Sequence, residues 1–524
     1  MKYARGRGKN VTIALPFGQQ TFRALVESGV ASFAGMVKWY NTVIMKKLWV
    51  VIALILSVPP AARACALLSQ GAQKEITPQQ QFQVAVSHYQ SGQYALAARE
   101  LENLARQMAP TFEVQELLGL VYSAEKKDLE ANRALQEAVR LSPDSAAARG
   151  NLAINLARLG KNREAEAEFK QAVHAAPDNF ETNHIFGEFY AHEGRLDEAI
   201  IYLAKAQSLQ PTSYDNGYDL SLAYEKAKRF KEARQQILEL LRVKRTAELY
   251  SLLADVDERS GNYLAAAKEY QQAVYLMPSE QNIFNWGSEF LLHNTWEPAI
   301  EIFSKGLQRY PNSAPLAIGL GMTLYWQGKY VDAVKALVRA TDLAPSDPNT
   351  YYFLGEAYER VPSDVGPEET DEVIARFRHF EELQPRNPRA AYYYAMSRWT
   401  GKKRQGRTAD PAQVESLLKK AIQLDPSFPK AHFQLGNVYS DKRQYTDAIS
   451  EYQQAIKLDP NVADVYYRLG QAYFHLGERD LAQKEFTLHQ KLLTHHQAED
   501  DRQRNRTFQF IYSTREHPAV HHSQ

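Results

Sequence analysis

The pattern of apolar and polar positions repeats regularly along residues 78–495, and prolines recur with the same period. Pro143, Pro177 and Pro211 lie 34 residues apart. A fixed period of this length over most of a chain predicts a solenoid built from one repeated unit. The same spacing separates Pro311 from Pro345 and Pro426 from Pro460.

Within each period, positions four, seven, eight and eleven carry apolar or small side chains, and so do positions twenty, twenty-four and twenty-seven. In the fourth unit, Phe186, Gly187 and Tyr190 belong to the first group, and Ala199 and Leu203 belong to the second. Each group has the spacing of one helix face, so each unit is predicted to be a pair of helices. The small residues at positions eight and twenty predict close contact within the pair. One pair cannot bury its apolar face alone, so we expect a continuous array.

The period places about twelve repeats along the chain. The fifth repeat lacks its closing proline near Arg245. The ninth and tenth are longer, with insertions near 361–373 and 400–413 that we expect to form loops. The repeats are predicted at 78–111, 112–145, 146–179, 180–213, 214–246, 247–279, 280–313, 314–347, 348–387, 388–428, 429–462 and 463–495.

The pattern of Leu-Gly, Tyr, Ala, Leu, Ala and Pro resembles the tetratricopeptide repeat family. It appears, for example, as Leu118, Gly119 and Tyr122 in the second unit and as Leu435 and Gly436 in the eleventh. The resemblance implies an all-α solenoid, a right-handed superhelix of about twelve helix-turn-helix units. It also implies a concave groove lined by the first helix of each pair.

Composition excludes several classes of protein. With one cysteine, the chain has neither an internal disulfide framework nor a cysteine-built metal site. Residues 1–64 hold nine of the 62 basic residues but only one of the 61 acidic residues, so residues 65–524 are mildly acidic and nucleic acid is not an expected partner. The chain contains no phosphate-binding lysine loop, Gly-rich dinucleotide turn, His-Glu-x-x-His or Gly-x-Ser-x-Gly motif. We therefore expect no enzyme activity, no cofactor and no metal site.

The N-terminal region has the order of an export signal. Two lysines after Met45 precede the apolar run 48–58, which is too short to span a membrane, and Cys65 follows Ala62-Arg63-Ala64. We interpret 45–64 as a signal peptide, 1–44 as an upstream extension that is not native, and 65–77 as a linker. Cleavage by signal peptidase, lipidation of Cys65 and an uncleaved anchor remain alternatives. All three place the folded body outside the cytoplasm. We expect a periplasmic or envelope-associated protein, with no membrane contact other than the signal or a lipid anchor.

The residues after the last repeat, 496–524, read as a polar C-terminal tail: a solvating helix and a frayed end. The histidines near this end lack a fixed geometry and do not form a specific metal site. They are His495, His496, His517, His521 and His522.

By the resemblance, positions two, five, nine, twelve and thirteen of each repeat face the groove. Acidic side chains dominate these positions in repeats two to six, and aromatic ones dominate them in repeats seven to twelve. The acidic half is suited to a basic ligand, and the aromatic half to an extended peptide or to sugar rings. The candidate partner-binding residues are Glu181, Glu188, Glu225, Asp255, Phe284, Tyr325, Trp326, Tyr352, Tyr393, Phe433 and Tyr467.

The sequence thus favours an exported, non-enzymatic scaffold that binds a protein or peptide segment in its groove and assembles an envelope complex. The alternative is a carbohydrate-handling module of polysaccharide export that uses the aromatic half. The repeat positions specify a groove and leave the identity of the partner and the oligomeric state open.

Overall fold

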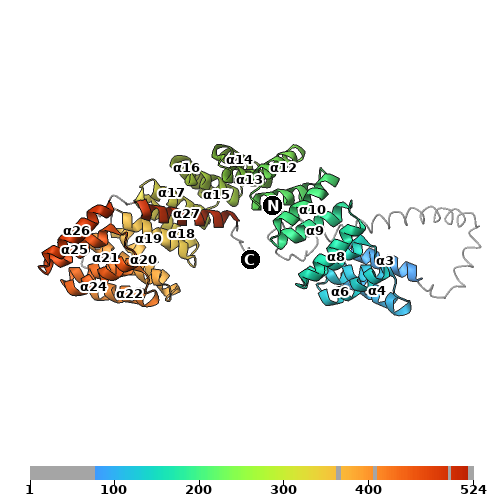
Figure 1. The fold of residues 1–524 in the computed structure, drawn as a ribbon, viewed down its shortest axis with the longest axis horizontal. Coiled ribbons are helices and arrows are strands. Elements are labelled where there is room, and N and C mark those ends of the chain that lie inside the picture. The colour runs from blue at the N-terminus through green and yellow to red at the C-terminus, as the bar shows by residue number, and fades with distance from the viewer. Residues whose placement is uncertain (1–76, 362–366, 405–409, 494–496, 517–524) are drawn as a thin grey trace, which may run out of the picture. The chain divides into compact units, whose positions relative to one another are not determined.

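The computed structural model describes residues 77–361, 367–404, 410–493 and 497–516. Within these ranges every regular element is an α-helix and there is no strand (Figure 1). The predicted all-α solenoid is confirmed. The upstream extension 1–44, the signal peptide 45–64, Cys65 and nearly all of the linker lie outside the described residues.

The chain divides into two compact units between Arg245 and Thr246. This is the place where the fifth repeat lacks its closing proline. Unit 1 contains ten described helices, which form five successive pairs. They are α3 (Pro78–Gln90), α4 (Tyr94–Gln107), α5 (Phe112–Ala124), α6 (Asp128–Leu141), α7 (Ala146–Arg158), α8 (Asn162–Ala175), α9 (Phe180–His192), α10 (Leu196–Leu209), α11 (Tyr214–Lys226) and α12 (Phe230–Val243).

Unit 2 contains seven further pairs and one additional helix, α27, after the last pair. Its described helices are α13 (Ala247–Arg259), α14 (Tyr263–Leu276), α15 (Glu280–Leu292), α16 (Trp296–Arg309), α17 (Ala314–Trp326), α18 (Tyr330–Leu343), α19 (Pro348–Arg360), α20 (Pro367–Leu383), α21 (Pro388–Arg404), α22 (Pro411–Leu424), α23 (Pro429–Asp441), α24 (Tyr445–Leu458), α25 (Ala463–His475), α26 (Arg479–Leu493) and α27 (Gln497–Glu516).

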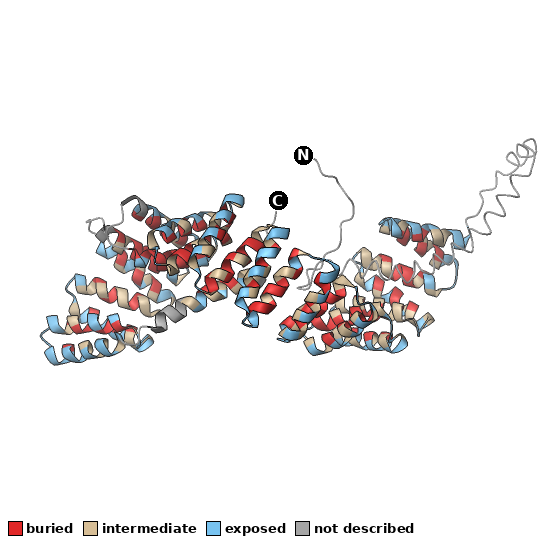
Figure 2. Cartoon of the chain, turned by 90° about the horizontal axis from the view of Figure 1, so that it is seen from above, coloured by how far each residue is buried: buried red, intermediate tan, exposed pale blue. Residues whose placement is uncertain are grey.

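The first helix of every pair begins at the first residue of the repeat frame read from the sequence. Buried residues form stripes along the helices, on the sides that face neighbouring helices (Figure 2). Within the fourth pair, a Cβ atom added to Gly187 of α9 would lie 2.6 Å from Cγ of Leu203 in α10. Position eight is therefore small because a large residue at position twenty-four occupies the adjacent space.

The turn inside each pair has a recurrent backbone conformation at position fifteen. Glycine fills this position in six repeats, for example Gly194 with φ of 73°, and Lys228 adopts φ of 58° at the same position. This left-handed conformation ends the first helix and directs the chain into the second. The other non-glycine residues at this position with positive φ are Lys126, Asn294 and Arg443.

The two insertions differ from the expected loops. Residues 362–366 and 405–409 lie outside the described residues, but much of the remaining extra length lengthens α20 and α21, which have 17 residues each. Pro367, followed by two glutamates, favours a helix start, and the basic residues 402–404 favour a helix end. Helix signals within the inserted residues therefore explain the difference.

Candidate binding site

Helix α27 lies against the first helices of four successive repeats in unit 2 (Figure 1). It contacts α13, α15, α17 and α19, which together present one continuous surface of first helices. We call this surface the α27 seat. Its contacting residues are Glu258, Gln281, Phe284, Asn285, Ser288, Glu289, Trp326, Tyr352 and Phe353.

One side of α27 is buried against the seat. Thr507 and Ile511, one helical turn apart, are buried, and Ile511 is completely inaccessible to solvent. The ring of Phe510 meets the rings of Phe284 and Phe353 edge-on, with centroids 6.1 and 5.7 Å apart. On the opposite side Asn505, Gln509 and Ser513 are exposed. The helix thus binds through one face, as an amphipathic helix does in a groove.

Polar contacts fix the position of α27 along the seat. Trp326 Nε1 donates to Thr507 Oγ1 at 3.3 Å, and Tyr512 donates its hydroxyl proton to Glu258 Oε1 at 2.8 Å. At the other end of the buried face, Arg506 donates to the hydroxyl of Tyr352. These bonds involve side chains of three different repeats, so they specify one register of the helix.

Arg515 enters a pocket at the C-terminal end of α27. Its Nη2 lies 3.2 Å from Glu289 Oε2 and 2.8 Å from Ser288 Oγ, and its guanidinium carbon lies 5.0 Å from the centroid of the Tyr270 ring. Burial opposes the charge of Arg515, but Tyr270, Glu289, Asp255 and Glu258 more than offset it, and its pKa is raised above its usual range. The pocket is therefore built for a cation.

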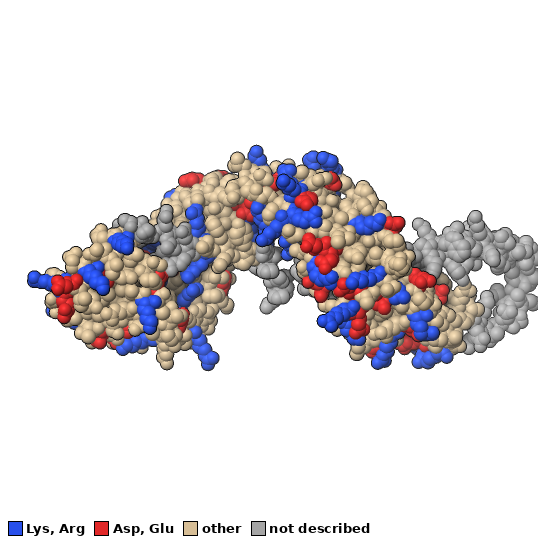
Figure 3. All heavy atoms as spheres, in the orientation of Figure 1, with Lys and Arg blue, Asp and Glu red and all other residues tan. Residues whose placement is uncertain are grey.

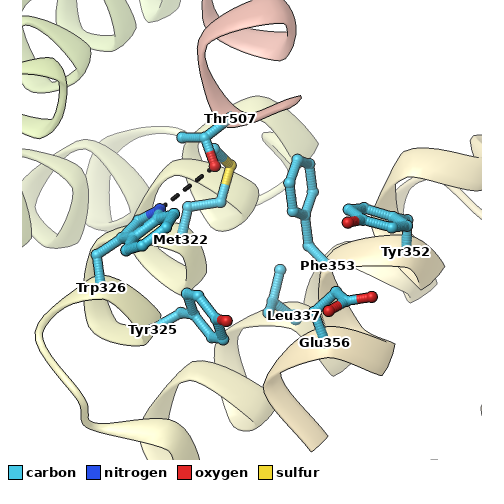
Figure 4. Close-up of a pocket in the computed structure, with 8 residues that line it drawn as sticks. All are labelled: Met322, Tyr325, Trp326, Leu337, Tyr352, Phe353, Glu356 and Thr507. Atoms are coloured by element: carbon cyan, nitrogen blue, oxygen red, sulfur yellow. Dashed lines mark hydrogen bonds between the residues drawn. The ribbon is translucent and has the colours of Figure 1, made fainter. Parts of the chain in front are cut away.

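Several of the aromatic residues predicted to bind a partner lie at the seat. Figure 4 shows a pocket where Tyr325, Trp326 and Tyr352 face Thr507 of α27 together with Phe353 and Glu356. Phe284 lies beneath Phe510, and Asp255 lies beside the Arg515 pocket, where it accepts a hydrogen bond from Tyr270. The structure thus brings five of the predicted residues together around one helix: Asp255, Phe284, Tyr325, Trp326 and Tyr352.

The other predicted aromatic residues pack within the array. The hydroxyl of Tyr393 donates to Glu356 Oε1 at 3.2 Å, and its ring stacks on Phe377 in the core. Phe433 packs on Tyr452, a residue of the second helix of its own repeat. Tyr467 packs on Phe486 and His489 in the same way and stays 41% exposed.

The acidic candidates of unit 1 occupy the first helices α9 and α11. Glu181 is half-buried, and Glu225 is buried. Glu188 lies beside His184, with Oε1 3.7 Å from Nε2, and both approach Asp219. Burial, and then the neighbouring carboxylate of Glu188, raise the pKa of Asp219 well above its usual range. On the face shown in Figure 3, acidic and basic side chains are interspersed over the helices of unit 1.

Sequence reasoning missed the residues of α27 that fill the seat. The region was expected to be a solvating tail because it is polar overall, yet Thr507, Ile511 and Arg515 recur at four-residue spacing. That spacing is the signal of a buried helix face, and a short apolar stretch around it strengthens the signal. His184 and Asp219 were also missed, because the two residues come from different repeats.

Family models for the tetratricopeptide repeat match several parts of both units. A model described as "TPR repeat" matches residues 321–361 and 436–477, and others described as "Tetratricopeptide repeat" match 85–146, 129–180, 151–214, 190–256 and 417–450. Together these stretches cover more than half of the chain. The chain belongs to the tetratricopeptide repeat family. Tetratricopeptide repeat proteins generally mediate protein–protein interaction.

Individual relatives are distant. Protein O-mannosyl-transferase TMTC1 of Homo sapiens is 26% identical over 202 residues, which are 37% of this chain and 23% of that protein. BBSome complex member BBS4 of Bos taurus is 23% identical over 386 residues, 68% of this chain and 69% of that protein. The chain spans less than a quarter of the length of the O-mannosyl-transferase relatives it matches. Among solved structures, Naa15/Naa10 bound to HypK-THB gives a TM-score of 0.37 at 14% identity, covering 78% of this chain and 68% of that one.

Among the described helices, none combines the length and the apolar character needed to cross a membrane.

Proposed function

We propose that this protein is a non-enzymatic, exported scaffold that binds a helical segment of a partner protein on the α27 seat and so assembles an envelope complex. The observation that carries the proposal is the helix already bound there. α27 buries Thr507 and Ile511 against the first helices, packs the partly buried ring of Phe510 on the seat and places Arg515 among acidic side chains. A surface that holds one helix in this way has the shape and charge to hold another.

The chemistry of α27 describes the partner. The partner segment carries a small hydroxyl side chain, an apolar side chain and a basic side chain at successive helical turns, matching Thr507, Ile511 and Arg515. A basic segment also agrees with the acidic half of the groove read from the sequence. In the free protein α27 occupies the same surface. Only molecules in which α27 has left the seat can bind the partner, so the apparent affinity is lowered in proportion to the fraction of such molecules.

The carbohydrate alternative receives less support from the side chains at the seat. Sugar binding by stacking needs exposed ring faces. Phe284 is 1% exposed and Tyr352 is 7% exposed. We therefore favour a protein partner.

Binding is tested by releasing α27 in an otherwise complete chain. A specific protease site replaces residues 494–496, the chain is cleaved, and a labelled peptide of residues 497–516 is titrated by fluorescence anisotropy. We expect saturable rebinding, weakened about tenfold or more by Ile511→Ala in the peptide, because that change deletes a fully buried side chain. A peptide with Ser513→Ala, which alters only the exposed side, is the matched control. Equal binding of both peptides would contradict the proposal.

The export part of the proposal rests on residues 45–64 and has its own test. Cells expressing the full sequence are fractionated, and the intact mass of the chain is measured. A mature chain starting near Cys65 in the envelope or periplasmic fraction is expected, and an added lipid mass would identify the lipidated form. A full-length chain in the cytoplasm would refute export without affecting the binding experiment.

A further inference from the structure

Three hydrogen-bond acceptors converge between the fourth and fifth repeats of unit 1. They are His184 and Glu188, four residues apart on α9, and Asp219 on α11. One nitrogen or oxygen atom from each residue lies within 4.8 Å of the other two. His184 and Asp219 are 3% and 4% exposed, so water solvates neither well.

The hydrogen bonds of His184 determine which nitrogen faces this cluster. Its Nδ1 lies 3.0 Å from Oδ1 of Asn216. The amide nitrogen of Asn216 donates to the carbonyl of Leu203 and to Oε1 of Gln207, so the orientation of that amide is fixed. Since Oδ1 can only accept, Nδ1 carries the proton, and in the neutral ring the lone pair of Nε2 points toward Glu188.

One carboxylate oxygen of Asp219 has no hydrogen-bond donor among the described residues. Its Oδ2 is buried and accepts no hydrogen bond from any described residue. Two carboxylates and an imidazole lone pair in a buried space repel one another unless a positive charge lies among them. A cation or additional protons at this position would offset that repulsion.

We propose that His184, Glu188 and Asp219 form a binding site for a divalent transition-metal ion such as Zn²⁺. One imidazole nitrogen with two carboxylates is a donor set that suits Zn²⁺, whereas Mg²⁺ and Ca²⁺ prefer oxygen ligands alone. Asn216 orients the histidine through its second nitrogen, as outer residues of metal sites commonly do. The side chain of Glu188 is 16% exposed and provides the access from solvent.

The site joins two repeats. Glu188 and His184 belong to the first helix of the fourth repeat, and Asp219 belongs to the first helix of the fifth. A bound ion cross-links α9 and α11 and stabilises the folded array by mass action. The sequence did not predict it because its ligands follow no contiguous motif.

The test compares the metal-free full chain with its Asp219→Asn variant. Zn²⁺ is titrated by calorimetry, and Co²⁺ is followed by visible absorption, which reports nitrogen and oxygen coordination. We expect the wild type to bind one more equivalent of Zn²⁺ than the variant, or to bind the tightest equivalent at least tenfold more strongly. The histidines near the C-terminus are present in both chains and contribute the same background.

Thermal unfolding provides a second readout. Zn²⁺ is expected to raise the Tm of the wild type and to leave that of Asp219→Asn unchanged, while Mg²⁺ affects neither chain. The metal-free variant is expected to be at least as stable as the metal-free wild type, because the change removes a buried unpaired carboxylate. Asp197→Asn, which removes an exposed carboxylate from the neighbouring helix α10, is the control and is expected to behave as the wild type. Equal Zn²⁺ binding by the wild type and Asp219→Asn would overturn the proposal in favour of a proton held by the cluster.

Discussion

Arg515 and Glu289 form an ion pair in which both side chains are almost completely buried, 5% and 1% exposed, with Nη2 and Oε2 3.2 Å apart. The two residues are 226 positions apart in the sequence and connect α27 to α15. Removing one member of such a pair leaves the other charge buried and uncompensated, which costs more than the pair itself contributes. Loss of either partner is therefore expected to weaken the binding of α27 to its seat.

Arg515→Met is expected to release α27 while the repeats remain folded. The free energy of local opening of α27 should fall by about 3 kcal/mol, because Glu289 loses its partner in a buried position. Hydrogen exchange of the amides of residues 504–515 measures this change. Gln509→Met, which alters an exposed side chain on the opposite face of the same helix, is the control and should change the opening free energy by less than about 1 kcal/mol. Equal protection in both variants would contradict the role assigned to Arg515.

Gly187→Ala is expected to destabilise unit 1 by about 1–3 kcal/mol, because the new methyl group would overlap Leu203. Gly150→Ala is the matched control. Gly150 also lies in a first helix of unit 1, but an added Cβ would meet no atom within 4 Å. This substitution should stabilise the helix by up to about 1 kcal/mol. Denaturant unfolding followed by circular dichroism distinguishes the two, and a loss of stability in both would refute the packing argument.

These residues also show what the sequence could and could not predict. A small residue at the position of Gly187 and a large apolar or aromatic one at the position of Leu203 recur along the array, so the helix pairs and their packing could be read from spacing alone. The contact between Phe510 and Phe284 does not recur with the repeat period. Helix α27 follows the last repeat and packs on helices that are distant from it in the sequence. The repeat frame located the first-helix face correctly at Phe284, Trp326 and Tyr352, but it could not identify what covers that face.

Tyr393 illustrates a second limit. It is the sixth residue of the tenth repeat, one past the fifth position that the resemblance assigns to the groove, and its side chain is only 4% exposed. The ring lies beside Gly355, where an added Cβ atom would overlap it, and stacks on Phe377. This candidate was therefore offset by one residue from the groove positions of its own repeat.

Lys228→Gly is expected to stabilise unit 1 by about 1 kcal/mol. Lys228 holds the left-handed conformation that glycine adopts at the same position of other repeats, and a side chain makes that conformation unfavourable by about 1–2 kcal/mol. Part of the gain is lost because glycine makes the unfolded chain more flexible. The reverse change, Gly194→Ala, should destabilise by a similar amount. Denaturant midpoints that move in the same direction for both variants would contradict this explanation.

Glu116 of α5 is expected to make the stability of unit 1 depend on pH. Burial, and then repulsion from Glu113, raise the pKa of Glu116 to about 7 in the folded protein, compared with 4.5 for the unperturbed group. The folded state therefore holds this proton more tightly than the unfolded state does. The contribution of Glu116 to stability is fully present below about pH 4.5 and is lost as the pH rises through about 7.

The variant Glu116→Gln keeps the shape of the side chain and removes the titration. Between pH 5 and pH 8 the wild type should lose stability relative to the variant, and above pH 8 the variant should be the more stable by at most about 3 kcal/mol. Denaturant unfolding at a series of pH values measures the difference. Glu113→Gln should bring the stability of a chain with Glu116 closer to that of the Glu116→Gln variant above pH 8, because it removes the charge that repels Glu116. A constant difference between wild type and Glu116→Gln across this range would show that Glu116 ionises as it does in the unfolded chain.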